Sequence, residues 1–104
     1  MGTLYYGSNP APIQMCDRLL AHLKVVVSTK LRRGEAFTVT WVHSDLQPSG
    51  RTTIWVQSAI PLRFVFDSDE PAQIDVRTLE TLVDAANQGN ISLSSDDLTA
   101  LERP

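Results

Sequence analysis

Three stretches between residues 37 and 66 alternate apolar and polar side chains, and this alternation limits the possible folds more than any other feature of the sequence. A side-chain period of two is that of a β-strand, in which successive residues point to opposite faces of a sheet. Short connections between the stretches favour antiparallel pairing, so we expect a three-stranded meander. The apolar positions expected to face the core are Phe37, Val39, Trp41, Ile54, Val56, Leu62, Phe64 and Phe66.

Two other segments repeat apolar residues with the helical period of about 3.6. The first runs from Cys16 to Leu31, with Asp17 as the expected N-cap, and the second begins at a cap, Asp75, and ends at Gly89. Each segment therefore predicts a helix with one apolar side facing the core. The outer, mildly basic side of the first helix is expected to carry His22.

The remaining apolar runs are short. Leu4–Tyr6 and Ile13–Met15 flank a turn-rich stretch and predict a hairpin, and Ile91–Leu93 predicts a last strand. The order β-β-α-β-β-β-α-β indicates an α+β fold, with two helices packed on one face of a largely antiparallel sheet. Because 104 residues suffice for one core but not for two, we expect a single α+β domain over residues 1–94. An acidic tail, residues 95–104, is expected to fray or to form one helical turn.

The stretch KLRRGEAF, residues 30–37, has two interpretations. Cations in the last helical turn and a glycine beyond them are a stop signal, since the helix end is partially negative and glycine accepts a left-handed conformation. The same cations, Lys30, Arg32 and Arg33, are also charges that would hold nucleic-acid phosphates. Together with Arg51 and Arg63 they form the set of nucleic-acid candidates, but the stop signal is the favoured interpretation.

Charge is distributed unevenly along the chain. Residues 1–66 carry seven Lys and Arg against three Asp and Glu, whereas residues 67–104 carry two against nine, for a net charge of −3. A basic part could attract polyanions that an acidic part repels. The two parts could equally complement one another, within a chain or between two subunits, and this second interpretation is favoured.

The alternation also predicts which side chains face away from the helices. A tryptophan on an open sheet face, Trp55, needs a partner, and three kinds are considered: another subunit or protein, cover by the N-terminal hairpin or the acidic tail, and single-stranded nucleic acid stacked on the ring. A subunit or partner interface is favoured, because a single tryptophan ring offers little area on which bases can stack. The candidate residues of this interaction face are Trp55, Val42, Thr53, Val65, Arg51 and Arg63.

Catalytic motifs are missing from the sequence. It has no phosphate-binding glycine loop, no G-x-S-x-G elbow and no H-E-x-x-H pair, so no cofactor and no metal site are expected. Cys16 lies on the apolar side of the first helix and is expected to be buried, and both histidines are expected at the surface. An enzyme would need a site assembled from distant residues such as His43, Asp45 and Arg51.

Neither a membrane span nor a secretory signal is expected, because the longest aliphatic run is Val25–Val27 and the first residues lack a basic and an apolar region. A single cysteine cannot form an internal disulfide, which fits a reducing compartment. These features favour a cytoplasmic protein without a membrane partner.

A set of short motifs is spread over most of the chain: Tyr6-Gly7, Asp17-Arg18-Leu19-Leu20-Ala21-His22-Leu23, Lys30-Leu31-Arg32-Arg33-Gly34-Glu35, Thr53-Ile54-Trp55 and Ile60-Pro61-Leu62. In this order they resemble a family of short, uncharacterised actinobacterial proteins, up to about Leu93. That family has no assigned activity to carry over, but some members bear the label "ATP-dependent DNA ligase", which implies a nucleic-acid context. A ligase binds its nucleotide covalently through the lysine of a K-x-D-G motif. The stretches that begin at Lys24 and Lys30 lack the aspartate and the glycine of that motif.

The favoured function is a non-enzymatic module that associates with itself, as a homo-oligomer, or with another protein through the face around Trp55. An accessory nucleic-acid-binding protein, in a DNA-repair or ligation context, is the first alternative. An enzyme with an unrecognised site is the second.

Overall fold

The computed structural model describes residues 1–8, 11–43 and 50–94 of the chain. The acidic tail, residues 95–104, and Asp45 lie outside these ranges. Helices and strands follow the order expected from the sequence, which confirms the α+β fold. They are β1 (Gly2–Tyr6), β2 (Ala11–Met15), α1 (Asp17–Arg32), β3 (Phe37–Val42), β4 (Arg51–Val56), β5 (Leu62–Val65), α2 (Val76–Asn87) and β6 (Asn90–Leu93).

The strands form two three-stranded sheets. Sheet A has the order β2-β1-β5 and sheet B the order β4-β3-β6. The β1/β2 and β3/β4 pairs are antiparallel, but the expected three-stranded meander is wrong, because β5 pairs with β1 rather than with β4. β6 instead joins β3 in parallel. Alternation in a sequence indicates which side of a strand is buried but not which strand lies beside it, so the pairing could not be inferred.

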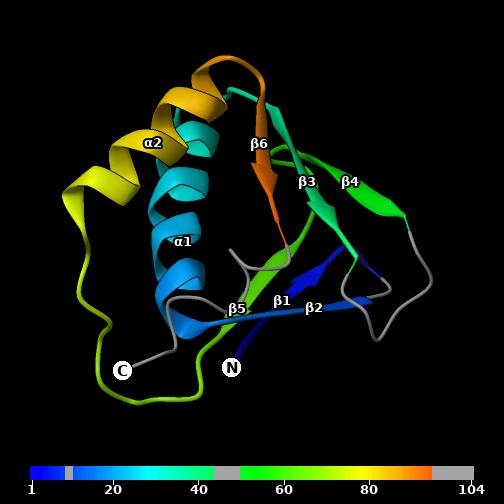
Figure 1. Cartoon of the computed structure of the whole chain (residues 1–104). Helices are drawn as coiled ribbons and strands as arrows, with labels where there is room; N and C mark the ends of the chain where they lie inside the picture. The colour runs from blue at the N-terminus through cyan, green and yellow to red at the C-terminus, as the bar shows by residue number, and fades with distance from the viewer. Residues whose placement is uncertain (9–10, 44–49, 95–104) are drawn as a thin grey trace.

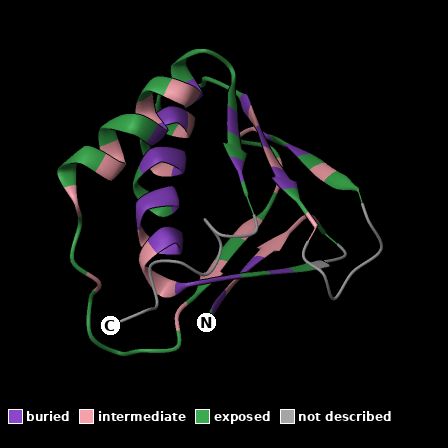
Figure 2. Ribbon diagram, viewed as in Figure 1, coloured by how far each residue is buried: buried purple, intermediate pink, exposed green. Residues whose placement is uncertain are grey.

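The two helices lie side by side, across the core from sheet B, while sheet A crosses below them (Figure 1). The core fills the space between α1 and the two sheets and draws on every element. Figure 2 shows buried residues along α1 and β3, whereas α2 is mostly exposed or half-buried. The largest fully buried side chains include Phe37, Met15, Leu20 and Leu23.

The end of α1 confirms the stop-signal interpretation of KLRRGEAF. Gly34 adopts a φ of 71°, and its N–H donates to the Leu31 carbonyl at 3.1 Å. The Glu35 N–H donates to the Lys30 carbonyl at 3.0 Å. These two bonds form a Schellman motif, which satisfies carbonyls at the helix end that would otherwise lack partners.

The start of α1 corrects the expected cap. Cys16, not Asp17, occupies the N-cap position and its side chain makes no capping hydrogen bond. The Asp17 carboxylate accepts hydrogen bonds from the N–H groups of Asp67 and Ser68, both at 3.1 Å. Asp17 therefore anchors the segment that follows β5, residues 66–75, to the first turn of α1.

His22 is fully buried, with 0% of its surface exposed, which corrects the expected surface position. Its Nε2 accepts the Asp75 N–H at 2.9 Å, so Nδ1 carries the proton and donates to the Arg18 carbonyl at 2.6 Å. The helical period assigned His22 to the outer side of α1, but His22 belongs to the buried residues of the helix and the start of α2 lies against it. His22 thus ties α1 to the start of α2.

Asp75 caps α2 as expected. Its carboxylate accepts the Thr78 N–H at 3.0 Å and the Thr78 hydroxyl at 2.5 Å. These hydrogen bonds, that of the Thr78 hydroxyl first, lower the pKa of Asp75 below its ordinary value of 3.8. The helix ends before Gly89, whose φ is 106°.

Candidate interaction site

The candidate site is the face of sheet B that points away from the helices, called here the outer face of sheet B. Two large apolar side chains on it are half exposed, Trp55 at 52% and Val42 at 51%. The residues that alternate with the outer face are buried, among them Val39, Ile54 and Ile91. The outer face consists of Thr38, Thr40 and Val42 from β3, Arg51, Thr53 and Trp55 from β4, and Asn90 and Ser92 from β6.

Short polar side chains in the middle of the outer face bind one another. The hydroxyls of Thr40 and Thr53 are 2.7 Å apart across the β3/β4 pair. Asn90 Oδ1 accepts from the hydroxyls of Thr38 at 2.7 Å and Thr40 at 3.1 Å, and its amide donates to Ser92 at 3.0 Å. These hydrogen bonds hold the short polar side chains in place. They form an ordered surface beside the larger Trp55 and Val42.

β4 is an edge strand of sheet B in the described part of the chain. The residue just before β4, Gly50, directs its carbonyl toward β3 and accepts the His43 N–H at 2.9 Å. Because alternate residues of a strand direct their backbone groups to opposite sides, those of Arg51, Thr53 and Trp55 point away from β3. In agreement, the Trp55 carbonyl accepts the Tyr6 hydroxyl at 2.7 Å from outside sheet B. The edge of β4 therefore offers backbone hydrogen-bonding groups, and the indole ring lies on the outer face beside that edge.

The six residues predicted for the interaction face do not form one surface. Val42, Arg51, Thr53 and Trp55 lie on the outer face of sheet B. Val65 and Arg63 lie on β5, in sheet A, where the Arg63 guanidinium stacks 4.9 Å from the centre of the Tyr5 ring. The incorrect meander is the reason, since it placed β5 next to β4.

The five cations predicted for nucleic acid are also dispersed. Lys30 is only 6% exposed, and its Nζ donates to Glu35 at 2.5 Å and to Asn87 at 2.9 Å. The hydrogen bond from Lys30 lowers the pKa of Glu35 below its ordinary value of 4.5. Lys30 therefore joins the ends of α1 and α2, whereas Arg32 and Arg33 are exposed. Arg51 and Arg63 lie on different sheets.

Of the residues with possible catalytic chemistry, His43 and Arg51 lie at neighbouring positions of the β3/β4 pair. The free thiol of Cys16 is buried, as expected. His43 Nε2 lies 2.6 Å from the Thr52 hydroxyl, and the proposed third member of an enzymatic site, Asp45, is outside the described residues. Among the described residues, no three His, Cys, Asp or Glu side chains gather in a way that could hold a metal ion. Neither helix in those ranges is long and apolar enough to span a membrane.

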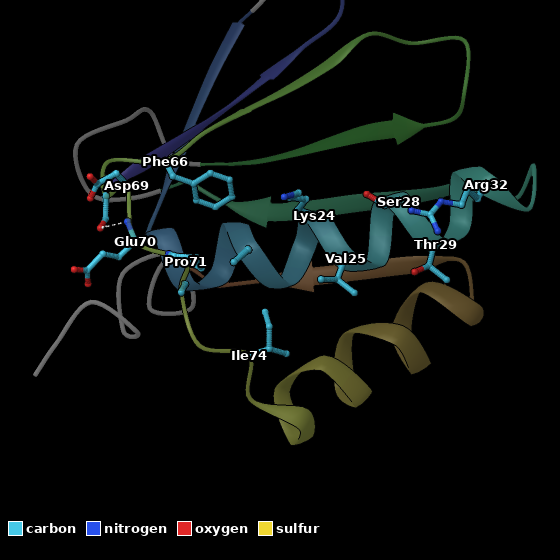
Figure 3. A pocket seen from close by; sticks show the side chains of 13 residues that line it. Lys24, Val25, Ser28, Thr29, Arg32, Phe66, Asp69, Glu70, Pro71 and Ile74 are labelled. Atoms are coloured by element: carbon cyan, nitrogen blue, oxygen red, sulfur yellow. Dashed lines mark hydrogen bonds between the residues drawn. The ribbon is translucent and has the colours of Figure 1, made fainter.

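A second surface, which the sequence did not suggest, is a groove along the outer side of α1. It has a volume of about 640 Å³ and is lined by α1 on one side and by the segment from Phe66 to Ile74 on the other (Figure 3). Val25 and Ile74 point into the groove from these two elements. The only sequence signal was that the outer side of α1, with Ala21, Val25 and Thr29, carries few charges.

Comparison with known proteins gives a family but no activity. A family model described as "Domain of unknown function (DUF7882)" matches residues 1–95, which confirms the resemblance to a family of unknown function. No curated protein and no solved structure is significantly similar to the chain.

Proposed function

The chain belongs to the DUF7882 family of unknown function, and on that premise we propose that it is a non-enzymatic module that pairs with a second copy of itself through β4. The observation that carries this proposal is the position of Trp55, half exposed on the outer face of an edge strand whose backbone groups at this residue point away from β3. Exposed tryptophan is enriched at the centres of protein interfaces because it removes a large apolar area from water when a partner covers it.

The free side of β4 suits a symmetric antiparallel pairing. In such a pair, residues whose backbone groups face the partner lie directly opposite one another. A two-fold axis at Thr53 places Arg51 of one copy opposite Trp55 of the second copy, on the same face. A guanidinium beside an indole ring gains cation–π attraction, so the side chains support the register that the backbone allows. The result is a continuous six-stranded sheet.

The Tyr6 hydroxyl bond to Trp55 is compatible with this pairing. A carbonyl oxygen has two lone pairs and can accept a second hydrogen bond from the other copy. Little else on β4 opposes pairing with a second copy, since its outward side chains include one charge, Arg51, and no proline. Edge strands that avoid pairing usually carry several charges, a proline or a bulge.

The test is the particle mass of Trp55→Glu, measured by light scattering during size-exclusion chromatography. We expect the unaltered protein to have twice the chain mass of 11.5 kDa and the variant to have the single mass. Val76→Glu is the matched control, because Val76 is 65% exposed on α2, away from both sheets. An unaltered protein of single mass, or a variant that keeps the doubled mass, contradicts the proposal.

Nucleic-acid binding is a second candidate, supported by Arg51 and Trp55 lying on the same strand and face. An indole ring can stack on a base while a guanidinium meets a phosphate. Self-association is preferred because Lys30 is engaged within the protein and Arg63 lies on the other sheet, so that few cations remain near Trp55.

A further inference from the structure

The groove along α1 has the dimensions of a peptide site. Its floor runs along the outer side of α1 from Ala21 to Arg32, which is about 16 Å at the helical rise per residue. About five residues of an extended peptide cover that length. The volume of about 640 Å³ also lies in the range of known ligand sites.

The chemistry of the groove is mixed along its length. Val25 and Ile74, 37% and 41% exposed, offer apolar contact in the middle. Ser28 and Thr29 line the floor with hydroxyls that can bind a peptide backbone. A purely apolar chain would leave these hydroxyls without hydrogen bonds where it covers them, so the lining favours a peptide over a lipid.

The two ends of the groove carry opposite charge. Arg32 lies on α1 at one end and Asp69 and Glu70 lie at the other, with Lys24 on α1 between them (Figure 3). No ion pair within the described residues joins these four side chains. The Lys24 ammonium lies 5.9 Å from the centre of the Phe66 ring. The charges are therefore available to a ligand with the complementary distribution.

The wall of the groove is fixed at both ends by side chains of α1. Asp17 holds the N–H groups of Asp67 and Ser68, and His22 holds the N–H of Asp75. The segment between these anchors needs little ordering when a ligand binds, which lowers the entropic cost of binding. Both anchors are polar contacts that α1 makes to a segment far away in the sequence, and the one at His22 is partly buried.

From these observations we infer that the groove binds an extended segment of another protein. The charge of this segment is distributed asymmetrically, with a basic end, an apolar middle and an acidic end. The acidic end lies at Arg32, the basic end at Asp69 and Glu70, and apolar side chains contact Val25 and Ile74. This site is separate from β4 and does not depend on self-association.

The test uses two fluorescein-labelled heptapeptides and fluorescence anisotropy at low salt. The first, Lys-Ser-Val-Leu-Val-Asp-Glu, has the inferred distribution, and the second has lysines in place of its two acidic residues. We expect the first peptide to bind the unaltered protein at least about tenfold more tightly than the second. In Arg32→Glu, whose position is solvent-exposed in the fold, the preference should reverse.

Arg33→Glu is the control, since it makes the same change of charge at an exposed position of the chain that does not line the groove. It should keep the preference of the unaltered protein. The inference is overturned if neither peptide binds at concentrations up to about 1 mM, or if the control shifts the preference as far as the groove variant does. Repeating the titration with Trp55→Glu separates the two proposals, because a single-mass particle should bind the first peptide unchanged.

Discussion

The outer face of sheet B and the groove along α1 are both surfaces of small polar side chains with a few exposed apolar ones, but they are assembled in different ways. The face consists of neighbouring strands, and hydrogen bonds between Thr40, Thr53 and Asn90 link adjacent strands directly. The groove exists because Asp17 and His22 hold a segment about fifty residues away in the sequence. A surface of the first kind follows from strand periodicity, whereas a surface of the second kind depends on individual tertiary contacts.

The largest effect that separates the two surfaces is expected from His22→Ala. The substitution leaves a cavity and removes the acceptor of the Asp75 N–H, so we expect the free energy of unfolding to fall by about 3 kcal/mol. Urea unfolding measures this loss, and Thr29→Ala, an exposed position of α1, is the control with an expected change of about 0.5 kcal/mol or less. Under native conditions, the folded variant should bind the first heptapeptide more weakly but keep the doubled mass.

An equal loss of peptide binding and of doubled mass in His22→Ala would contradict the distinction between the two surfaces. It would indicate that the contacts around His22 support the whole molecule to the same extent. A loss of neither would show that the wall of the groove does not depend on this anchor.

A smaller effect is expected from acid, at two contacts of the helices. The pKa of Asp75 is lowered by Thr78 and that of Glu35 by Lys30, so each ionised carboxylate stabilises the folded state. This stabilisation is complete above the ordinary values of 3.8 and 4.5 and is lost as the pH falls through the lowered ones. Urea unfolding between pH 6 and pH 2.5, at about half-unit steps, should therefore show a shallower acid decline in Asp75→Asn and in Glu35→Gln.

The two variants should differ in their effect on the groove. Asp75 lies at the anchored end of the groove wall, whereas Glu35 lies beyond the other end of α1. Peptide binding at neutral pH should weaken in Asp75→Asn and stay unchanged in Glu35→Gln. Equal acid profiles for both variants and the unaltered protein would show that neither carboxylate gains stability from its contact.

Much of the fold could be predicted because local chemistry specifies it. Gly34 after a cationic turn ended α1, Asp75 capped α2, and alternation at Trp55 placed the ring outward. Each of these features depends on residues close together in the sequence. The order of helices and strands follows from the same short-range patterns.

The rest depends on contacts between distant residues, which such patterns do not contain. β5 pairs with β1 because both strands present apolar faces to the same core. The sequence of neither strand indicates which strand it pairs with. Lys30 is typical of a helix end by its sequence, but Glu35 and Asn87 cover it. His22 is buried for a similar reason, since the segment that covers it begins more than forty residues later.

The most direct test of self-association through β4 is cross-linking with a short bismaleimide at single introduced cysteines. Thr53→Cys and Ser92→Cys both lie exposed on the outer face of sheet B, on its two opposite edge strands, and the native Cys16 is buried. In the proposed pair, the two Cβ atoms at position 53 are about 5 Å apart across the two-fold axis. The account predicts a covalent dimer for Thr53→Cys and only monomer for Ser92→Cys, whereas equal cross-linking at both positions, or none at either, would contradict it.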